Sequence, residues 1–131
     1  MPKKSDLMGL GMPPFLAARM ATEPVVSTAA GGSRASATAI GGVQYLTCFN
    51  ASNSGAGAVL PALGGDGCLL GDDFIVNNQI VGGMTLYAPT GMAISMGGSL
   101  ASGSGGVALS SHTTATLYPV SSSTWVGVTG T

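Results

Sequence analysis

Charge is scarce in this sequence. Charged residues make up 7% of the 131 positions, whereas soluble globular domains carry roughly 25%. All four basic residues lie within the first 34 positions, and no lysine or arginine follows Arg34. Binding to nucleic acid depends on neutralising phosphates with Lys and Arg, so we expect no nucleic-acid partner.

So little charge also bears on solubility, because charged side chains keep a monomer's surface in solution. The composition therefore favours a subunit that hides part of its surface in an oligomer or on a larger assembly. The alternative is a small globular domain whose surface is solvated by Ser, Thr and Asn.

Catalytic groups are few. The single histidine, His112, follows Ser110 and Ser111, and Asp72 or Asp73 could join it in a triad. No nucleophile elbow of the G-x-S-x-G type surrounds a strand end. We therefore expect His112 to be an exposed loop residue between two strands, and we expect no enzyme activity.

Metal ligands lack the usual spacing. The aspartates do not follow the alternating pattern of a calcium loop. We expect Asp66 to be a turn residue, and we expect Asp72 and Asp73 to lead into a strand. Cys48 and Cys68 lack the C-x-x-C spacing of zinc sites. The sequence predicts no metal site and no cofactor.

No long apolar run is present either. The apolar stretch 7–21 is interrupted by glycine, proline and Arg19, unlike a signal peptide or a membrane span. We expect a protein that is made and kept in a cytoplasm, without a membrane partner. In that compartment Cys48 and Cys68 are expected to be buried thiols rather than a disulfide.

The first 23 residues read as an N-terminal arm. Residues 5–12 are apolar and broken by glycine, which favours an extended segment. Pro13 and Pro14 then lead into the good helix formers of 15–21, and Pro24 would end this short helix. Two helical turns are unstable alone, so we expect the arm to dock on its own domain, a sister subunit or another protein.

The remainder is expected to form one β-domain, 40–131, after a flexible linker, 24–39, rich in small residues. Short apolar or alternating segments recur there between Gly, Pro, Asn and Ser. They predict an all-β fold, a small antiparallel sandwich or barrel-like domain with an extended arm that contains one short helix. The predicted strands are 43–49, 58–60, 68–70, 74–76, 84–88, 92–96, 107–109, 114–120 and 124–128.

Two features of the domain remain open on sequence alone. The glycine-rich stretch 97–106 is either a mobile hairpin tip or a binding loop. Trp125 is either a core or a subunit-interface residue.

In its arm and in the order of its β segments, the chain resembles small bacteriophage virion proteins of the head-decoration (cement) or head-fibre type. The arm segment 6–14, followed by Leu16 and Ala17, is similar to the opening of such proteins. The resemblance in the body rests on Leu60-Pro61, Gly65-Asp66, Phe74 to Asn78, Leu86 to Gly91, Leu117-Tyr118 and Ser121 to Trp125.

The resemblance implies a homotrimer that binds the major capsid protein on the outside of a phage capsid and stabilises or decorates it, without catalysis. The arm residues expected to contact the capsid or a neighbouring subunit are Leu7, Leu10, Met12, Phe15, Leu16 and Met20. The residues expected at an oligomer interface are Leu86, Tyr87 and Trp125. The alternative is a head-fibre or tail-appendage module that binds host glycans through loop 97–106 or Trp125.

Overall fold

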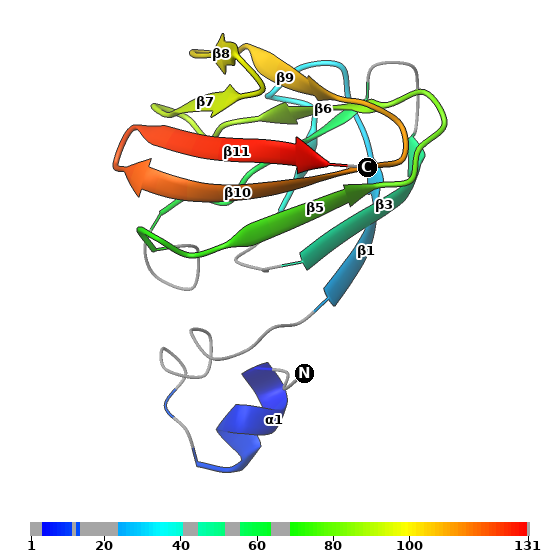
Figure 1. The fold of residues 1–131 in the computed structure, drawn as a ribbon. Coiled ribbons are helices and arrows are strands. Elements are labelled where there is room, and N and C mark those ends of the chain that lie inside the picture. The colour runs from blue at the N-terminus through cyan, green and yellow to red at the C-terminus, as the bar shows by residue number, and fades with distance from the viewer. Residues whose placement is uncertain are drawn as a thin grey trace.

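Strands dominate the protein, as the sequence predicts. The computed structural model describes residues 4–11, 13, 24–40, 45–51, 56–63 and 69–130, and Figure 1 shows their arrangement. One short helix, α1 (Lys4–Gly9), is present. It lies where we expected an extended segment, and the helix expected at 15–21 lies outside the described residues.

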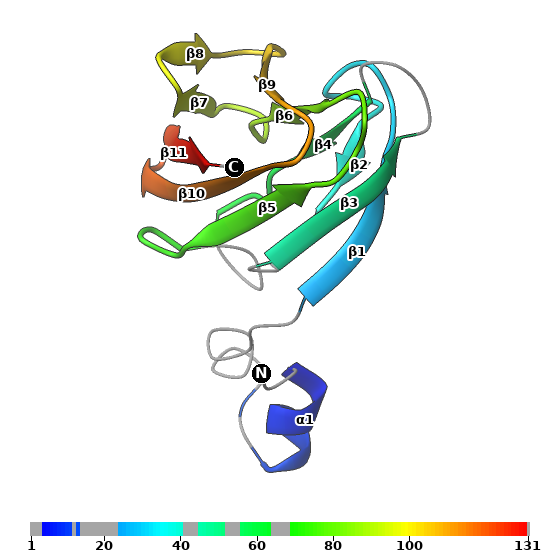
Figure 2. The same cartoon turned by 45° about the vertical axis from the view of Figure 1, so that its right-hand side comes forward.

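The strands form two sheets. The seven-stranded sheet has the order β1 (Pro24–Ala29), β3 (Tyr45–Ala51), β5 (Phe74–Asn78), β10 (Thr113–Ser121), β11 (Thr124–Gly130), β7 (Ala93–Met96) and β8 (Ser99–Ala101). The four-stranded sheet has the order β2 (Thr38–Ala39), β4 (Gly57–Val59), β6 (Met84–Tyr87) and β9 (Gly106–Leu109). Figure 2 brings β2 and β4 into view behind the larger sheet.

The first six strands alternate between the two sheets. β1, β3 and β5 lie side by side in the large sheet, and β2, β4 and β6 lie side by side in the small one. Each of these neighbours is therefore parallel, because the chain returns in the same direction after crossing to the other sheet. The predicted all-antiparallel arrangement is wrong, and both sheets are mixed.

Residues 24–39, which we expected to be a flexible linker, contain β1 and β2. β1 pairs with β3 from Pro24 to Ala29, and β2 pairs with β4 through Thr38 and Ala39. Small residues allow this because backbone hydrogen bonds hold a strand even where the side chains add little packing.

The end of the chain adds antiparallel hairpins. β10 and β11 pair along most of their length and lie between β5 and β7. β7 and β8 form a second hairpin whose tip is Gly97-Gly98, with φ of 60° and 81°. Two left-handed residues are what a tight hairpin of this twist needs. Stretch 97–106 is thus a hairpin tip followed by a strand and a turn, rather than one continuous loop.

The expected strand at 68–70 is not formed by its described residues. Leu69 and Leu70 belong to a turn, in which the Leu69 carbonyl accepts from the backbone N–H of Asp72 at 3.0 Å. Gly71 has a φ of 85°, and its N–H donates to the Pro119 carbonyl at 3.1 Å. Cys68 lies outside the described residues.

Side chains from both sheets form one apolar core, so the sheets pack face to face. Phe74 and Val76 of β5 alternate with outward-facing residues and are fully buried, and Leu86 of β6 and Leu109 of β9 meet them from the small sheet. This alternation is the pattern of a strand with one buried face. The sandwich thereby leaves one outer face on each sheet for other roles.

Candidate functional site

The outer face of the large sheet is organised in cross-strand rows. Ile75 of β5 lies opposite Thr116 of β10, which lies opposite Val128 of β11. In the next row, Tyr118 lies opposite Val126. The alternate residues of β10 and β11 are buried, so both rows face away from the core. Figure 1 shows β5, β10 and β11 side by side beneath this face.

This face is uncharged, and apolar side chains share it with Thr, Ser and Asn. None of the seven strands contains a Lys, Arg, Asp or Glu. Val128 is 66% exposed, and Tyr118 and Val120 are also exposed. Exposed apolar side chains gathered on one surface mark an interaction site more often than scattered ones do. The face is therefore the best candidate for contact with another protein.

The three residues expected at an oligomer interface are buried in this chain. Leu86 and Trp125 are fully enclosed by the core, and Tyr87 is 6% exposed. Their side chains offer little surface to a second subunit in this arrangement, and their assignment to an oligomer interface stays a prediction. Alternation along β11 explains the burial of Trp125, which faces the core between the half-buried Thr124 and Val126.

Tyr87 reaches its buried position by an unusual route. Alternation along β6 places it on the outer side of the small sheet, because its neighbour Leu86 belongs to the core. Its ring packs against two glycines. A methyl group added to Gly57 would lie 2.7 Å from the Tyr87 ring, and one added to Gly106 would lie 2.8 Å from it. The two glycines thus leave room for an aromatic ring to lie flat on the strands.

Most of the predicted arm contacts lie outside the described residues. This holds for Met12, Phe15, Leu16 and Met20. Leu7 lies in α1, and its side chain is not described. Leu10 is 85% exposed and Met8 is also exposed. The described end of the arm therefore presents apolar side chains that the protein's own core does not cover.

The few charged groups of the body support its loops. The Arg34 guanidinium donates a hydrogen bond to the Gly103 carbonyl, which ties the turn after β1 to the turn after β8. Asp72 accepts a hydrogen bond from the Leu69 N–H at 2.9 Å. Asp72 and the exposed Asp73 stand directly before β5, as expected for residues that lead into a strand. Asp66 lies outside the described residues.

A polar cluster occupies the end of the sandwich where β9 passes into β10. The buried Asn78 amide donates to the carbonyls of Leu109 and Ser110, both at 2.9 Å, and its oxygen accepts from the Ile80 N–H at 2.9 Å. His112 lies exposed in the turn, as expected, with its Nδ1 3.2 Å from the Gln79 Oε1. Asn78 thereby joins the large sheet to the end of the small one.

Within the described part of the chain, no three His, Cys, Asp or Glu side chains gather as a metal site would require. No helix among the same residues has the length and hydrophobicity to cross a membrane. No family model, curated protein or solved structure matches this chain.

Proposed function

We propose that the protein is a structural component of a bacteriophage virion, which binds the outside of the capsid and stabilises or decorates it as a homotrimer. It is made in the cytoplasm of the host, and its partners are the major capsid protein and further copies of itself. The proposal rests on the resemblance described above. The uncharged outer face of the large sheet is the structural observation that supports it most.

The absence of charged residues from the outer face of the large sheet favours contact with further copies of this chain over contact with a different protein. Around a symmetry axis, residues near the axis meet their own copies. A charged residue there would face a like charge, and like charges in an interface oppose association. Val128, Thr116 and Ile75 carry no such penalty. A face made for an unrelated protein is free to use charge complementarity, and this one does not.

The arm supports the second contact, with the shell. Leu10 and Met8 expose apolar surface that water solvates poorly, and burying it against a capsid subunit would contribute about 25 cal/mol for each Å² removed from water. Each copy needs to contribute only a small free energy of binding. A protein that binds the assembled shell but not its free subunits stabilises the assembled state by mass action.

The decisive experiment removes residues 1–23 and measures binding to purified capsids from the phage that encodes the protein. We expect the truncated protein to keep its β-domain and its oligomeric state but to lose most of its capsid occupancy. A matched variant, Leu10→Ala with Met8→Ala, should weaken binding less than the deletion does. Undiminished occupancy of the truncated protein would reject the arm as the anchor.

The alternative is a head-fibre or tail module that binds host glycans through loop 97–106 or Trp125. Trp125 is fully buried, so its indole is not available to stack on a sugar. The turn 102–105 within that loop is exposed. A glycan array that compares the unmodified protein with Ser102→Ala and Ser104→Ala tests whether this turn binds glycans.

A further inference from the structure

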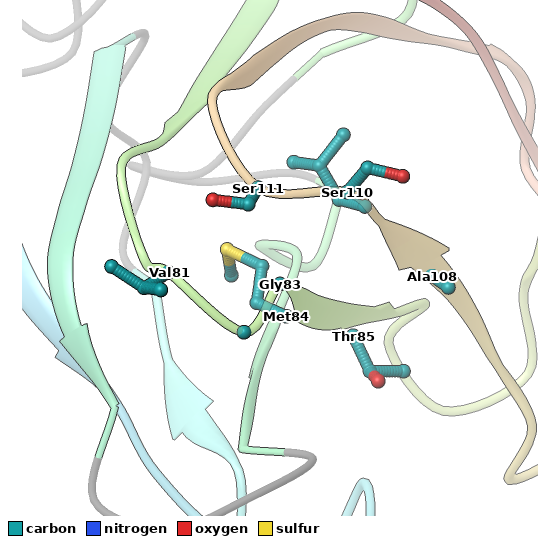
Figure 3. Close-up of a pocket in the computed structure, with 9 residues that line it drawn as sticks. Val81, Gly83, Met84, Thr85, Ala108, Ser110 and Ser111 are labelled. Atoms are coloured by element: carbon teal, nitrogen blue, oxygen red, sulfur yellow. The ribbon is translucent and has the colours of Figure 1, made fainter.

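A pocket of about 460 Å³ opens where β6 begins and β9 ends. This volume falls within the roughly 300–1,000 Å³ of small-molecule sites. Figure 3 shows its lining, which comes from the connection before β6, the paired strands and the turn after β9. The lining residues are Val81, Gly82, Gly83, Met84, Thr85, Ala108, Leu109, Ser110 and Ser111.

Small residues create the space. Thr85 and Ala108 lie opposite each other in the β6–β9 ladder, and neither side chain is large enough to fill the area above the strands. Gly82 and Gly83 form one wall without side chains. Gly83 has a φ of 79°, a backbone conformation that favours glycine.

The turn beside the pocket holds a hydroxyl without a partner. The Oγ of Ser111 is buried and has no hydrogen bond within the described part of the chain. Leaving a buried polar group unpaired costs about 1–3 kcal/mol. Because Ser111 lines the pocket, a ligand there is a candidate partner for this hydroxyl.

The next residue carries backbone strain. His112 is the one non-glycine residue with positive φ, at 57°, among those described. A left-handed conformation costs an ordinary residue roughly 1–2 kcal/mol, and such strain gathers at functional sites. Gln79 holds the ring through Nδ1 at 3.2 Å, and its own amide nitrogen donates to the Asn77 oxygen at 2.8 Å. These contacts fix the strained turn beside the end of β5.

The chemistry of these groups points to one ligand class. No charged side chain lines the pocket. Its polar side chains are those of Thr85, Ser110 and Ser111, and Val81 and Ala108 add apolar surface. Neutral hydroxyl groups and apolar C–H faces on one small molecule are the features of an uncharged sugar.

We propose that this pocket binds a neutral saccharide unit. The ligand's hydroxyl groups exchange hydrogen bonds with Ser110 and Ser111, and its C–H face packs on Ala108 and Val81. This site lies on the small sheet and its turn, away from the outer face of the large sheet that the proposed assembly uses. The proposal does not depend on capsid binding.

The test is a titration of the full-length, isotope-labelled protein with glucose, galactose, N-acetylglucosamine and N-acetylneuraminic acid. Binding is monitored by NMR through the amide chemical shifts. We expect weak binding, with a Kd on the order of 1 mM. At least one neutral sugar should shift the amides of 81–85 and 108–112 in a saturable manner. No saturable shift with any neutral sugar, or tighter binding of the acidic sugar, would overturn the proposal.

Two variants locate the site. Ala108→Phe places a ring in the pocket from an exposed position and should weaken binding at least about tenfold, whereas the matched control Ala35→Phe, also exposed, should not. Ser111→Ala should weaken binding, and Ser122→Ala in the β10–β11 turn should leave it unchanged. Equal binding by Ala108→Phe and Ala35→Phe would place the sugar elsewhere and reject the pocket. The unperturbed amides of each variant report whether it has folded.

Discussion

The indole ring of Trp125 meets the phenyl ring of Phe74 edge to face, with ring centroids 6.3 Å apart and an interplanar angle of 82°. This is a favoured geometry for two aromatic rings, whose positive edges attract negative faces. β10 lies between the strands of these two residues, so the pair connects three neighbouring strands on the core side. The same strands carry the uncharged outer face, and the core pair therefore supports the surface proposed for assembly.

Replacing Trp125 with alanine should be strongly destabilising. Loss of a fully buried aromatic side chain costs about 3–5 kcal/mol, which urea denaturation would measure as a lower free energy of unfolding. Trp125→Phe should cost less, because it retains a ring and removes an Nε1–H that is buried without a partner within the described part of the chain. Tyr118→Ala, on the exposed face, is the control. A loss below about 1 kcal/mol for Trp125→Ala would contradict the burial described here.

Asn78 should be the polar residue whose loss is most costly. Asn78→Ala removes the partner of two carbonyls and one N–H, and each unpaired buried group costs about 1–3 kcal/mol. We expect a loss of about 2–4 kcal/mol in the free energy of unfolding, together with faster amide hydrogen exchange at Ile80. Asn77→Ala, next in the strand and only half-buried, should cost less than half as much. Similar losses for the two variants would show that the bridge between the sheets is unimportant.

Gly57 should not tolerate a side chain. In Gly57→Ala the new methyl group would lie 2.3 Å from the Thr85 carbonyl oxygen and 2.7 Å from the Tyr87 ring. Relief of such contacts requires a backbone shift, and overpacking of this kind costs about 1–3 kcal/mol. Gly82→Ala has no atom within 4 Å of the added methyl group and is the matched control. Thermal unfolding should separate the two variants by several degrees, and equal melting temperatures would refute the close packing of Tyr87.

Val128→Lys should dissociate the proposed oligomer. A lysine at this position would meet its own copies near the symmetry axis, and repulsion with the loss of apolar contact would oppose association. Sedimentation velocity should show a monomer at concentrations where the unmodified protein is trimeric. Val81→Lys introduces the same change at a position that is 83% exposed on a turn and should leave the oligomer intact. If the Val128→Lys variant stays trimeric, the outer face of the large sheet is not the contact surface.

The positions of most strands follow from the sequence alone. Short apolar or β-rich segments mark β5, β10 and β11, and glycine, proline, asparagine or serine marks the breaks between strands. The sequence predicts Asp72 as a residue that leads into a strand and His112 as an exposed loop residue, and both are confirmed because local backbone preferences decide them. The predicted antiparallel direction of the strands was wrong. Side chains alternate with a period of two in both parallel and antiparallel sheets, so the pattern does not distinguish them.

Tertiary structure alone decided the rest. β1 and β2 have no distinctive pattern, and they become strands because partners in two different sheets accept their backbone hydrogen bonds. Tyr87 stands at an outward position, and its ring packs against two glycines of neighbouring strands, which lie 30 and 19 positions away in the chain. The low content of charged residues is a property of the sequence. Which uncharged residues face outward together depended on the register of β5, β10 and β11, and register is a property of the folded sheet.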